Sequence, residues 1–159
     1  GLGNGFDLRV NTERPLAVGG GIGIPPLYGL AKRLPEREKL TVVLGFNTSE
    51  ESFYIEEFEA LGCRVVVSTV DGSLGEKGFV TDVIKKLKLD YDYVLACGPM
   101  PMLKALRSLR DTPGQYSFEA RMACGFGACM GCAIETVSGM KRVCRDGPVF
   151  KTEEILWRI

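Results

Sequence analysis

The stretch Leu16-Ala-Val-Gly-Gly-Gly-Ile-Gly-Ile-Pro-Pro26 decides the fold class. Its first residues form an apolar run typical of a buried strand, the glycines indicate a tight turn, and residues 27–34 have helical character. Proline is tolerated in the first turn of a helix, because the N–H groups there have no partner within the helix. Strand, glycine turn and helix in this order predict one βα unit.

The same strand–helix pattern recurs along the chain. Further strands are expected at residues 40–46, 64–70 and 91–97, and helices at 48–61, 79–87 and 101–109. Strands that are apolar on both faces are typical of a parallel sheet covered by helices on each side. The fold class predicted is therefore α/β, with a doubly wound parallel-sheet nucleotide-binding domain.

The pattern changes at Asp111-Thr-Pro-Gly114, after which the apolar runs are short and Ser138-Gly139 predicts a hairpin turn. We therefore expect a nucleotide-binding domain over residues 11–113 and a small, mostly β domain over residues 114–159. Residues 1–10 are rich in turn formers and read as the tail of a preceding domain. Because the first residue is not Met, we expect the chain to be part of a longer protein.

The composition excludes several classes of function. Twenty basic and twenty acidic residues cancel, which argues against a nucleic-acid partner, and no apolar run is long enough for a membrane span. Four of the six cysteines are clustered, which favours metal binding in a reducing compartment over disulfides. We therefore expect a cytoplasmic protein.

The clustered cysteines are Cys124, Cys129 and Cys132, followed by Cys144. The spacing C-x4-C-x2-C with a fourth cysteine further on is the plant-type [2Fe–2S] pattern. The glycines between them allow backbone N–H groups to approach the sulfurs. We predict that these four thiolates hold a [2Fe–2S] cluster.

Other metal sites fit this pattern less well. The sequence contains no His, which excludes Cys2His2 zinc and Rieske-type ligation. Zinc held by cysteines alone remains an alternative, although structural zinc prefers two C-x2-C pairs and only one is present. Arg121 and Arg145 are either cations that offset the charge of the cluster or solvated surface residues. Phe126 or Met130 could shield the cluster or meet a partner.

The glycine turn is the first candidate nucleotide site, with Gly19, Gly20, Gly21, Gly23, Pro25 and Pro26 as its residues. It follows the carboxyl end of a strand, where open α/β sheets bind ligands, and it resembles G-x-G-x-x-G with proline in the third place. Its backbone amides and the helix N-terminus suit a pyrophosphate. The alternative is a tight turn without a ligand.

The stretch Cys97-Gly-Pro-Met-Pro-Met102 ends the fourth strand at the same edge of the sheet. We expect Cys97, Gly98 and Pro99 to form a wall beside a nicotinamide ring, with Met100 and Met102 as apolar contacts. The alternative is a buried cysteine followed by a turn.

Two further stretches at this edge bear on the choice of nucleotide. Asp71, after the third strand, is another candidate contact. The second strand ends in Gly45-Phe-Asn-Thr-Ser49, without the acidic residue of the standard fingerprint. Glu50 and Glu51 follow, and no Lys or Arg occurs between residues 45 and 54. This favours NAD over NADP.

The glycine turn paired with Cys97–Met102 resembles the nucleotide domain of the ferredoxin reductase family. Within that family, Glu119-Ala-Arg-Met-Ala-Cys124 with the rest of the cysteine loop, and Val143-Cys-Arg-Asp-Gly-Pro-Val-Phe150, resemble the electron-transfer subunits of NAD-dependent dihydroorotate dehydrogenase B. The resemblance implies that the four cysteines bind [2Fe–2S] and that the two turns bind NAD. It also implies that FAD binds mainly to a preceding flavin-binding barrel, of which residues 1–10 are the tail.

The implied partner is an FMN-containing catalytic subunit that oxidises dihydroorotate to orotate in pyrimidine biosynthesis, within a heterotetramer. Electrons are then expected to pass from FMN through the cluster and FAD to NAD+. One alternative is a reductase subunit of a hydrogenase or of another flavin complex. A second is a zinc-stabilised nucleotide-binding or interaction module without a redox role.

Overall fold

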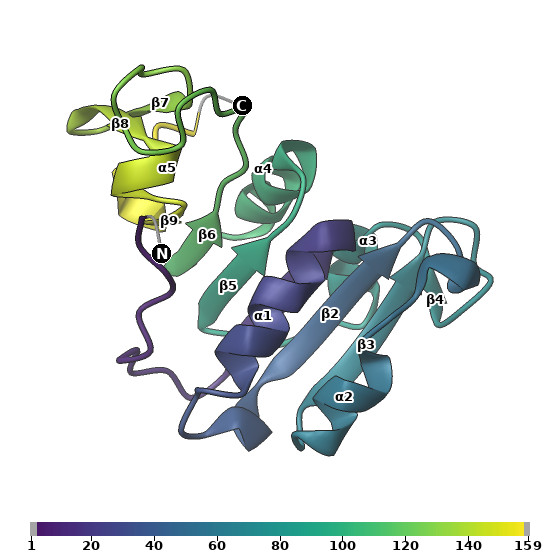
Figure 1. The fold of residues 1–159 in the computed structure, drawn as a ribbon. Coiled ribbons are helices and arrows are strands. Elements are labelled where there is room, and N and C mark those ends of the chain that lie inside the picture. The colour runs from purple at the N-terminus through teal and green to yellow at the C-terminus, as the bar shows by residue number, and fades with distance from the viewer. Residues whose placement is uncertain (1–2, 158–159) are drawn as a thin grey trace.

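The central strand β1 (Pro15–Gly20) is buried along its whole length and pairs in parallel with β2 (Thr41–Phe46) and with β5 (Tyr93–Cys97). The computed structural model, which describes residues 3–157, extends this trio into a sheet of order β4-β3-β2-β1-β5-β6-β9 (Figure 1). The remaining strands are β3 (Arg64–Thr69), β4 (Glu76–Lys77), β6 (Gly114–Ser117) and β9 (Val149–Lys151). All pairings are parallel except that of β6 with β9.

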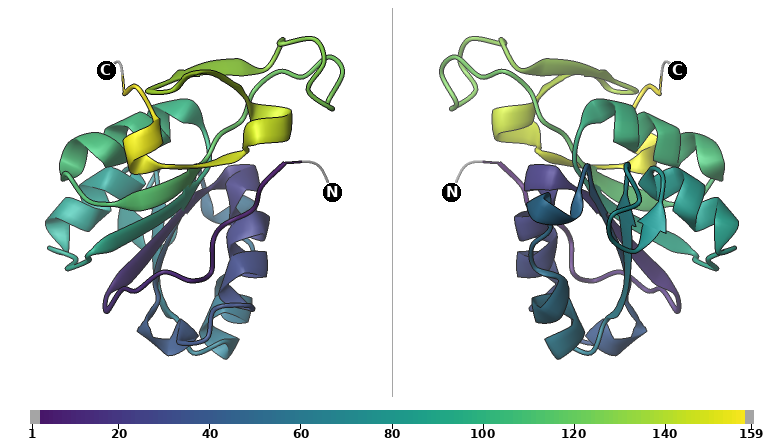
Figure 2. Two further views of the ribbon diagram at one scale, coloured as in Figure 1. Left: turned by 90° about the vertical axis from the view of Figure 1, so that its left-hand side faces the viewer. Right: turned by 90° about the vertical axis from the view of Figure 1, so that its right-hand side faces the viewer.

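Helices cover both faces of the sheet (Figures 1 and 2). On one face lie α1 (Ile24–Ala31) and α2 (Ile55–Ala60), which bury Ile24, Leu27 and Phe58. On the other lie α3 (Val80–Lys86) and α4 (Met100–Leu109), which bury Val83, Leu103 and Leu106. The predicted doubly wound parallel sheet is confirmed.

The strand order reverses beside β1, because the chain runs outward from β1 to β2, β3 and β4 and then returns to β5 on the other side. Such a reversal leaves a crevice outside the carboxyl ends of the two strands, since their following connections diverge. The turn after β1 is the 3-10 segment Gly21–Gly23, and the turn after β5 is Gly98–Pro99. The fold therefore places the two predicted nucleotide turns side by side.

The helix expected over residues 48–61 is wrong in its first half. The structure has a 3-10 turn, Ser49–Glu51, and α2 begins only at Ile55, after Tyr54 with φ 64°. The Glu51 carboxylate accepts hydrogen bonds from the N–H and the side-chain amide of Asn47, so it does not form a capping box with Thr48. The left-handed conformation at Tyr54 then breaks the helix.

The C-terminal part of the chain shares the main sheet. Strands β6 and β9 extend the sheet beyond β5, and the hairpin β7 (Ala133–Thr136) and β8 (Gly139–Arg142) lies above its edge with the short helix α5 (Val143–Asp146) (Figure 2). The division after residue 113 stays a prediction, but the sheet continues across it. Among the described helices, none has the length and apolar character needed to cross a bilayer.

The segment before β1 is tied to this edge of the sheet. The buried side chain of Gln115 in β6 bonds the backbone of Asp7 twice, accepting from its N–H at 2.7 Å and donating to its carbonyl at 3.0 Å. Asn4 bridges to Pro148, just beyond α5. Residues 4–7 therefore pack against both the sheet and the cysteine-bearing part of the chain.

Candidate nucleotide site and metal centre

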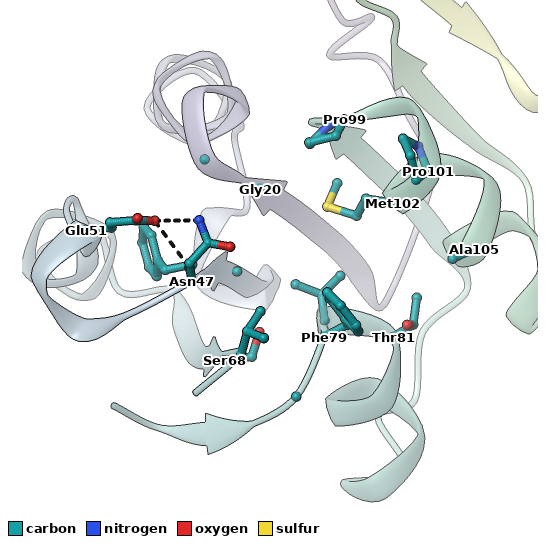
Figure 3. Close-up of a pocket in the computed structure, with 16 residues that line it drawn as sticks. Gly20, Asn47, Glu51, Ser68, Phe79, Thr81, Pro99, Pro101, Met102 and Ala105 are labelled. Carbon is teal, nitrogen blue, oxygen red and sulfur yellow. Dashed lines mark hydrogen bonds between the residues drawn. The ribbon is translucent and has the colours of Figure 1, made fainter. Parts of the chain in front are cut away.

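A cavity of about 470 Å³ opens at the carboxyl edge of the sheet, beside the turn after β1 (Figure 3). Its residues come from the ends of β1, β2 and β3, from the start of α3 and from the first turns of α4. The lining consists of Gly20, Gly21, Gly45, Phe46, Asn47, Glu51, Ser68, Val70, Gly78, Phe79, Val80, Thr81, Pro99, Pro101, Met102 and Ala105. A largely apolar cavity with few polar groups is typical of a cofactor site.

The turns after β1 and β5 approach so closely that only glycine fits between them. A Cβ atom on Gly23 would lie 2.1 Å from the carbonyl oxygen of Cys97, and one on Gly20 would lie 2.8 Å from Sδ of Met102. Gly21 has φ +51° and open space around it, so its backbone faces solvent at the mouth. The glycines therefore close the junction and leave the turn free to approach a phosphate.

Three of the polar lining residues, Asn47, Glu51 and Ser68, lie at the β2 and β3 side of the cavity, and Thr81 lies at the start of α3 (Figure 3). Glu51 is the one ionisable side chain among the described lining residues, and it accepts a bond of 2.8 Å from the side chain of Asn47. Ser68 is buried, and its Oγ has no hydrogen-bond partner. A buried unpartnered hydroxyl is costly, and a ligand atom in the cavity would satisfy it.

Of the predicted nucleotide residues, Gly20, Gly21, Pro99 and Met102 line the cavity. Gly19, Gly23, Cys97 and Gly98 form the packed junction behind it, where burial raises the pKa of the Cys97 thiol. Pro25 and Pro26 are exposed in the first turn of α1, and Met100 is half-buried at the start of α4. The two predicted turns are thus brought together.

Asp71 is not part of the cavity lining. Its carboxylate accepts hydrogen bonds from the N–H and the hydroxyl of Ser73, which lower its pKa. This carboxylate therefore stabilises the loop after β3, and the structure does not bring it to the other candidate residues.

Asn47, Ser68, Phe79 and Thr81 also line the cavity and are not among the residues predicted from the sequence. A signal for them was present, because Asn47 follows the carboxyl end of β2, Ser68 lies near that of β3, and Phe79 and Thr81 lie at the start of α3. Ser and Asn at such positions are too common to single out without the cavity in view.

The cysteines approach one another in two pairs rather than at one point. Cys132 and Cys144 are both buried, and the N–H of Cys144 donates to Sγ of Cys132 at 3.4 Å. This hydrogen bond lowers the pKa of Cys132, whereas burial raises the pKa of Cys144. The N–H of Val143 also donates to the carbonyl of Cys132, which fixes α5 against the cysteine loop.

The other pair is Cys124 and Cys129, which are more accessible to solvent. Backbone N–H groups of Cys129, Phe126 and Ala128 point at the sulfur of Cys124 and lower its pKa to about 6. Positive φ angles at Gly125 and Gly127 make this inward turn of the amides possible. Such N–H···S contacts suit a thiolate that binds metal.

All six cysteines are free, and within residues 3–157 no three Cys, Asp or Glu side chains converge on one ion position. A structural zinc ion requires four ligands around a single centre. A [2Fe–2S] cluster has two irons and needs two protein ligands at each. Each pair supplies the two cysteines that one iron of a [2Fe–2S] cluster needs.

Arg142 is an arginine whose guanidinium is hydrogen-bonded to the cysteine loop. Arg121 and Arg145 are exposed, and only the stem of Arg145 reaches the loop, where it packs against Gly127. Arg142 is held in place instead, with its guanidinium donating to Gly127 O at 2.8 Å and to Asp146 at 3.1 Å. Arg142 lies at the end of a β-hairpin, two residues before Cys144, and nothing in the sequence around it indicates the contact with Gly127.

The crevice and the paired cysteines define an α/β nucleotide-binding domain that carries a candidate metal-binding element. Two family profiles match the sequence, an oxidoreductase NAD-binding domain over residues 17–108 and the iron–sulfur cluster binding domain of dihydroorotate dehydrogenase B over residues 119–156. The chain belongs to the oxidoreductase NAD-binding domain family.

Curated relatives agree with this assignment. The sequence is 50% identical to the dihydroorotate dehydrogenase B (NAD(+)) electron transfer subunit of Bacillus pumilus, covering 97% of this chain and 62% of the relative. It is 48% identical to the subunit of that name from Fusobacterium nucleatum, with coverage of 97% and 62%. The chain therefore resembles these subunits but spans less than two thirds of their length.

A solved structure of an NADH-dependent reduced ferredoxin-NADP oxidoreductase, described in connection with flavin-based electron bifurcation, has the same fold. Its TM-score is 0.81 at 35% sequence identity, covering 98% of this chain and 58% of that one. A flavohemoglobin from Malassezia yamatoensis aligns with a TM-score of 0.53 at 17% identity over 64% of this chain and 29% of that one, which shows a shared fold alone. The ferredoxin-reductase-like fold is confirmed.

Proposed function

We propose that this chain is the NAD- and cluster-binding part of an electron-transfer subunit of NAD-linked dihydroorotate dehydrogenase. The observation that carries the proposal is the presence, in one chain, of an apolar cavity at the β1–β5 crevice and of two cysteine pairs, formed by the loop of residues 124–132 and by α5. The match of residues 119–156 to the cluster domain of dihydroorotate dehydrogenase B supports this particular enzyme.

The residues divide into two binding roles. Gly20 and Gly21 would receive the pyrophosphate of NAD, with Pro99 and Met102 packing against the nicotinamide half. Cys124 with Cys129, and Cys132 with Cys144, would each hold one iron. The cluster supplies one-electron transfer, and FAD, bound mainly outside this chain, converts between one- and two-electron chemistry.

The proposed partner is the FMN-containing catalytic subunit that oxidises dihydroorotate to orotate, in a cytoplasmic heterotetramer. Co-expression and copurification of this subunit with the native protein test the assignment. We expect a stable complex that couples dihydroorotate oxidation to NAD+ reduction, with red-brown colour that bleaches on reduction. Recovery of a hydrogenase subunit, with no dihydroorotate-dependent NADH formation, would overturn it.

A second candidate is a reductase subunit of an electron-bifurcating or hydrogenase complex. The 35% identity to the bifurcating oxidoreductase over nearly the whole chain favours it, although the identity to the dihydroorotate dehydrogenase subunits is higher. The two candidates share the cofactors and differ in the partner, so copurification separates them. A colourless protein with one zinc per chain would contradict both.

Glu51 is expected to select NAD over NADP. As the one ionisable residue of the described lining, it suits a ribose hydroxyl and repels a 2′-phosphate. In Glu51→Gln a charge-assisted hydrogen bond becomes a neutral one, so NAD+ binding should weaken by about 1 kcal/mol, about fivefold. NADP+ binding should stay the same or strengthen. Isothermal titration calorimetry with both nucleotides measures the change.

Glu50→Gln is the matched control, because Glu50 is exposed and is not part of the lining. It removes the same charge one residue away, and we expect the NAD+/NADP+ preference to stay at the wild-type value. Unchanged binding of both nucleotides in Glu51→Gln would show that Glu51 does not contact the ribose.

A further inference from the structure

Gly127, in the middle of the first cysteine loop, is buried although Phe126 and Ala128 on either side are exposed. Arg142 donates from Nη1 to its carbonyl oxygen at 2.8 Å. A Cβ atom on Gly127 would lie 2.7 Å from Cδ of Arg145, so the stem of that arginine covers its α-carbon. Residues in and beside α5 therefore hold Gly127 at two points.

Cys144, the α5 member of the buried cysteine pair, follows Arg142 by two residues. Arg142 fixes the carbonyl of Gly127. The loop that carries Cys124 and Cys129 is thus joined to the helix that carries Cys144 through a single glycine.

The guanidinium of Arg142 is itself fixed at its other end. Oδ2 of Asp146 accepts from the Arg142 backbone N–H at 2.8 Å and from its Nε at 3.1 Å. Both side chains are 24% exposed, so the pair is mostly shielded from water. The carboxylate of Asp146 balances the positive charge of the Arg142 guanidinium. Arg142 therefore acts here mainly through the fixed directions of its N–H donors.

We propose that Arg142 is a positioning residue for the iron–sulfur site. It holds the loop of Cys124 and Cys129 on the segment that carries Cys144, keeps backbone N–H groups of the site directed at the cysteine sulfurs, and thereby retains the cluster and raises its reduction potential. This inference rests on the proposed function, since it requires the four cysteines to hold a cluster. Hydrogen bonds to ligand sulfurs stabilise the reduced, more negative state of a cluster, so their loss lowers the potential.

The test compares Arg142→Met and Arg142→Lys with wild type in the full-length native protein, purified anaerobically. The readouts are the midpoint potential from a spectroscopic redox titration and the rate of iron release to a chelator. We expect the potential to fall in both variants, and iron release to be about tenfold faster, as for other residues that orient metal ligands. Lysine keeps the positive charge, but its ammonium group cannot donate hydrogen bonds to Asp146 and Gly127 with the fixed geometry of a guanidinium.

Arg121→Gln is the control, because it removes an exposed cation near the loop and should leave both readouts unchanged. NAD+ binding should be unaffected in every variant, since Arg142 does not line the cavity. A wild-type midpoint potential in Arg142→Lys would assign the effect to charge and overturn the positioning role. An unchanged potential and an unchanged rate of iron release in Arg142→Met would overturn it as well. A wild-type protein without a cluster would instead refute the proposed function itself.

Discussion

Gly23→Ala is expected to abolish NAD+ binding and to destabilise the fold. The new Cβ would lie 2.1 Å from the carbonyl oxygen and 2.4 Å from the carbonyl carbon of Cys97, and 2.7 Å from the nitrogen of Gly98. These are backbone atoms of β5 and its turn, which cannot rotate away as a flexible side chain would. Relief of the clash must separate the turns after β1 and β5, and with them Gly20 and Pro99 of the cavity wall.

The cost of Gly23→Ala should be steric alone. Gly23 has φ −73° and ψ −11°, a conformation that alanine adopts freely. Overpacking of this kind typically costs 1–3 kcal/mol, so we expect about that loss in the free energy of unfolding. Thermal denaturation and calorimetric NAD+ titration measure the two effects.

Gly29→Ala is the matched control in the same helix region. Nothing lies within 4 Å of a Cβ at this position. Alanine in a helix is favoured over glycine by about 1 kcal/mol, so this variant should bind NAD+ normally and be slightly more stable. Normal NAD+ affinity and stability in Gly23→Ala would contradict the close junction between the turns.

The four βα units could be predicted from the sequence because their signals are local. Apolar runs and Gly or Pro at their ends mark β1, β2, β3 and β5 independently of the tertiary structure. Strand β6 reads Gly-Gln-Tyr-Ser and carries no such run, yet Tyr116 is 1% exposed. Its partners, β5 in parallel and β9 in antiparallel, decide its conformation, and neither pairing is visible in the sequence.

The residues of the candidate sites also fall into two groups, those that a local motif marks and those that only long-range contacts reveal. The cysteine spacing and the two glycine-rich turns are short motifs, so their residues could be named from the sequence. The polar groups that complete the sites depend on long-range contacts. Ser68 matters because its buried hydroxyl lacks a partner, and Arg142 because the hairpin places it 2.8 Å from the carbonyl of Gly127, fifteen residues earlier. Nothing in the sequence distinguishes Arg142 from an arginine that is exposed to solvent.

Cys132→Ser is expected to remove the cluster while NAD+ binding persists. Cys132 is the more constrained member of the buried pair, because its sulfur accepts from the N–H of Cys144 and its carbonyl accepts from Val143. Serine would replace a thiolate with a hydroxyl, a poor ligand for an iron–sulfur centre. Iron per chain should fall from about two to nearly none, with loss of the visible absorption.

Cys63→Ser controls for the loss of a buried thiol. Cys63 lies on the α1–α2 side of the sheet, where its Sγ donates to the carbonyl of Arg37 at 3.5 Å. Serine can keep that hydrogen bond, so iron content and absorption should stay at wild-type values. The two variants together separate ligation from folding, because both alter buried cysteines and only Cys132 belongs to a pair. Full iron content in Cys132→Ser would show that Cys132 is not a ligand of the cluster. The iron assigned to Cys132 and Cys144 would then lack one of its two proposed cysteines.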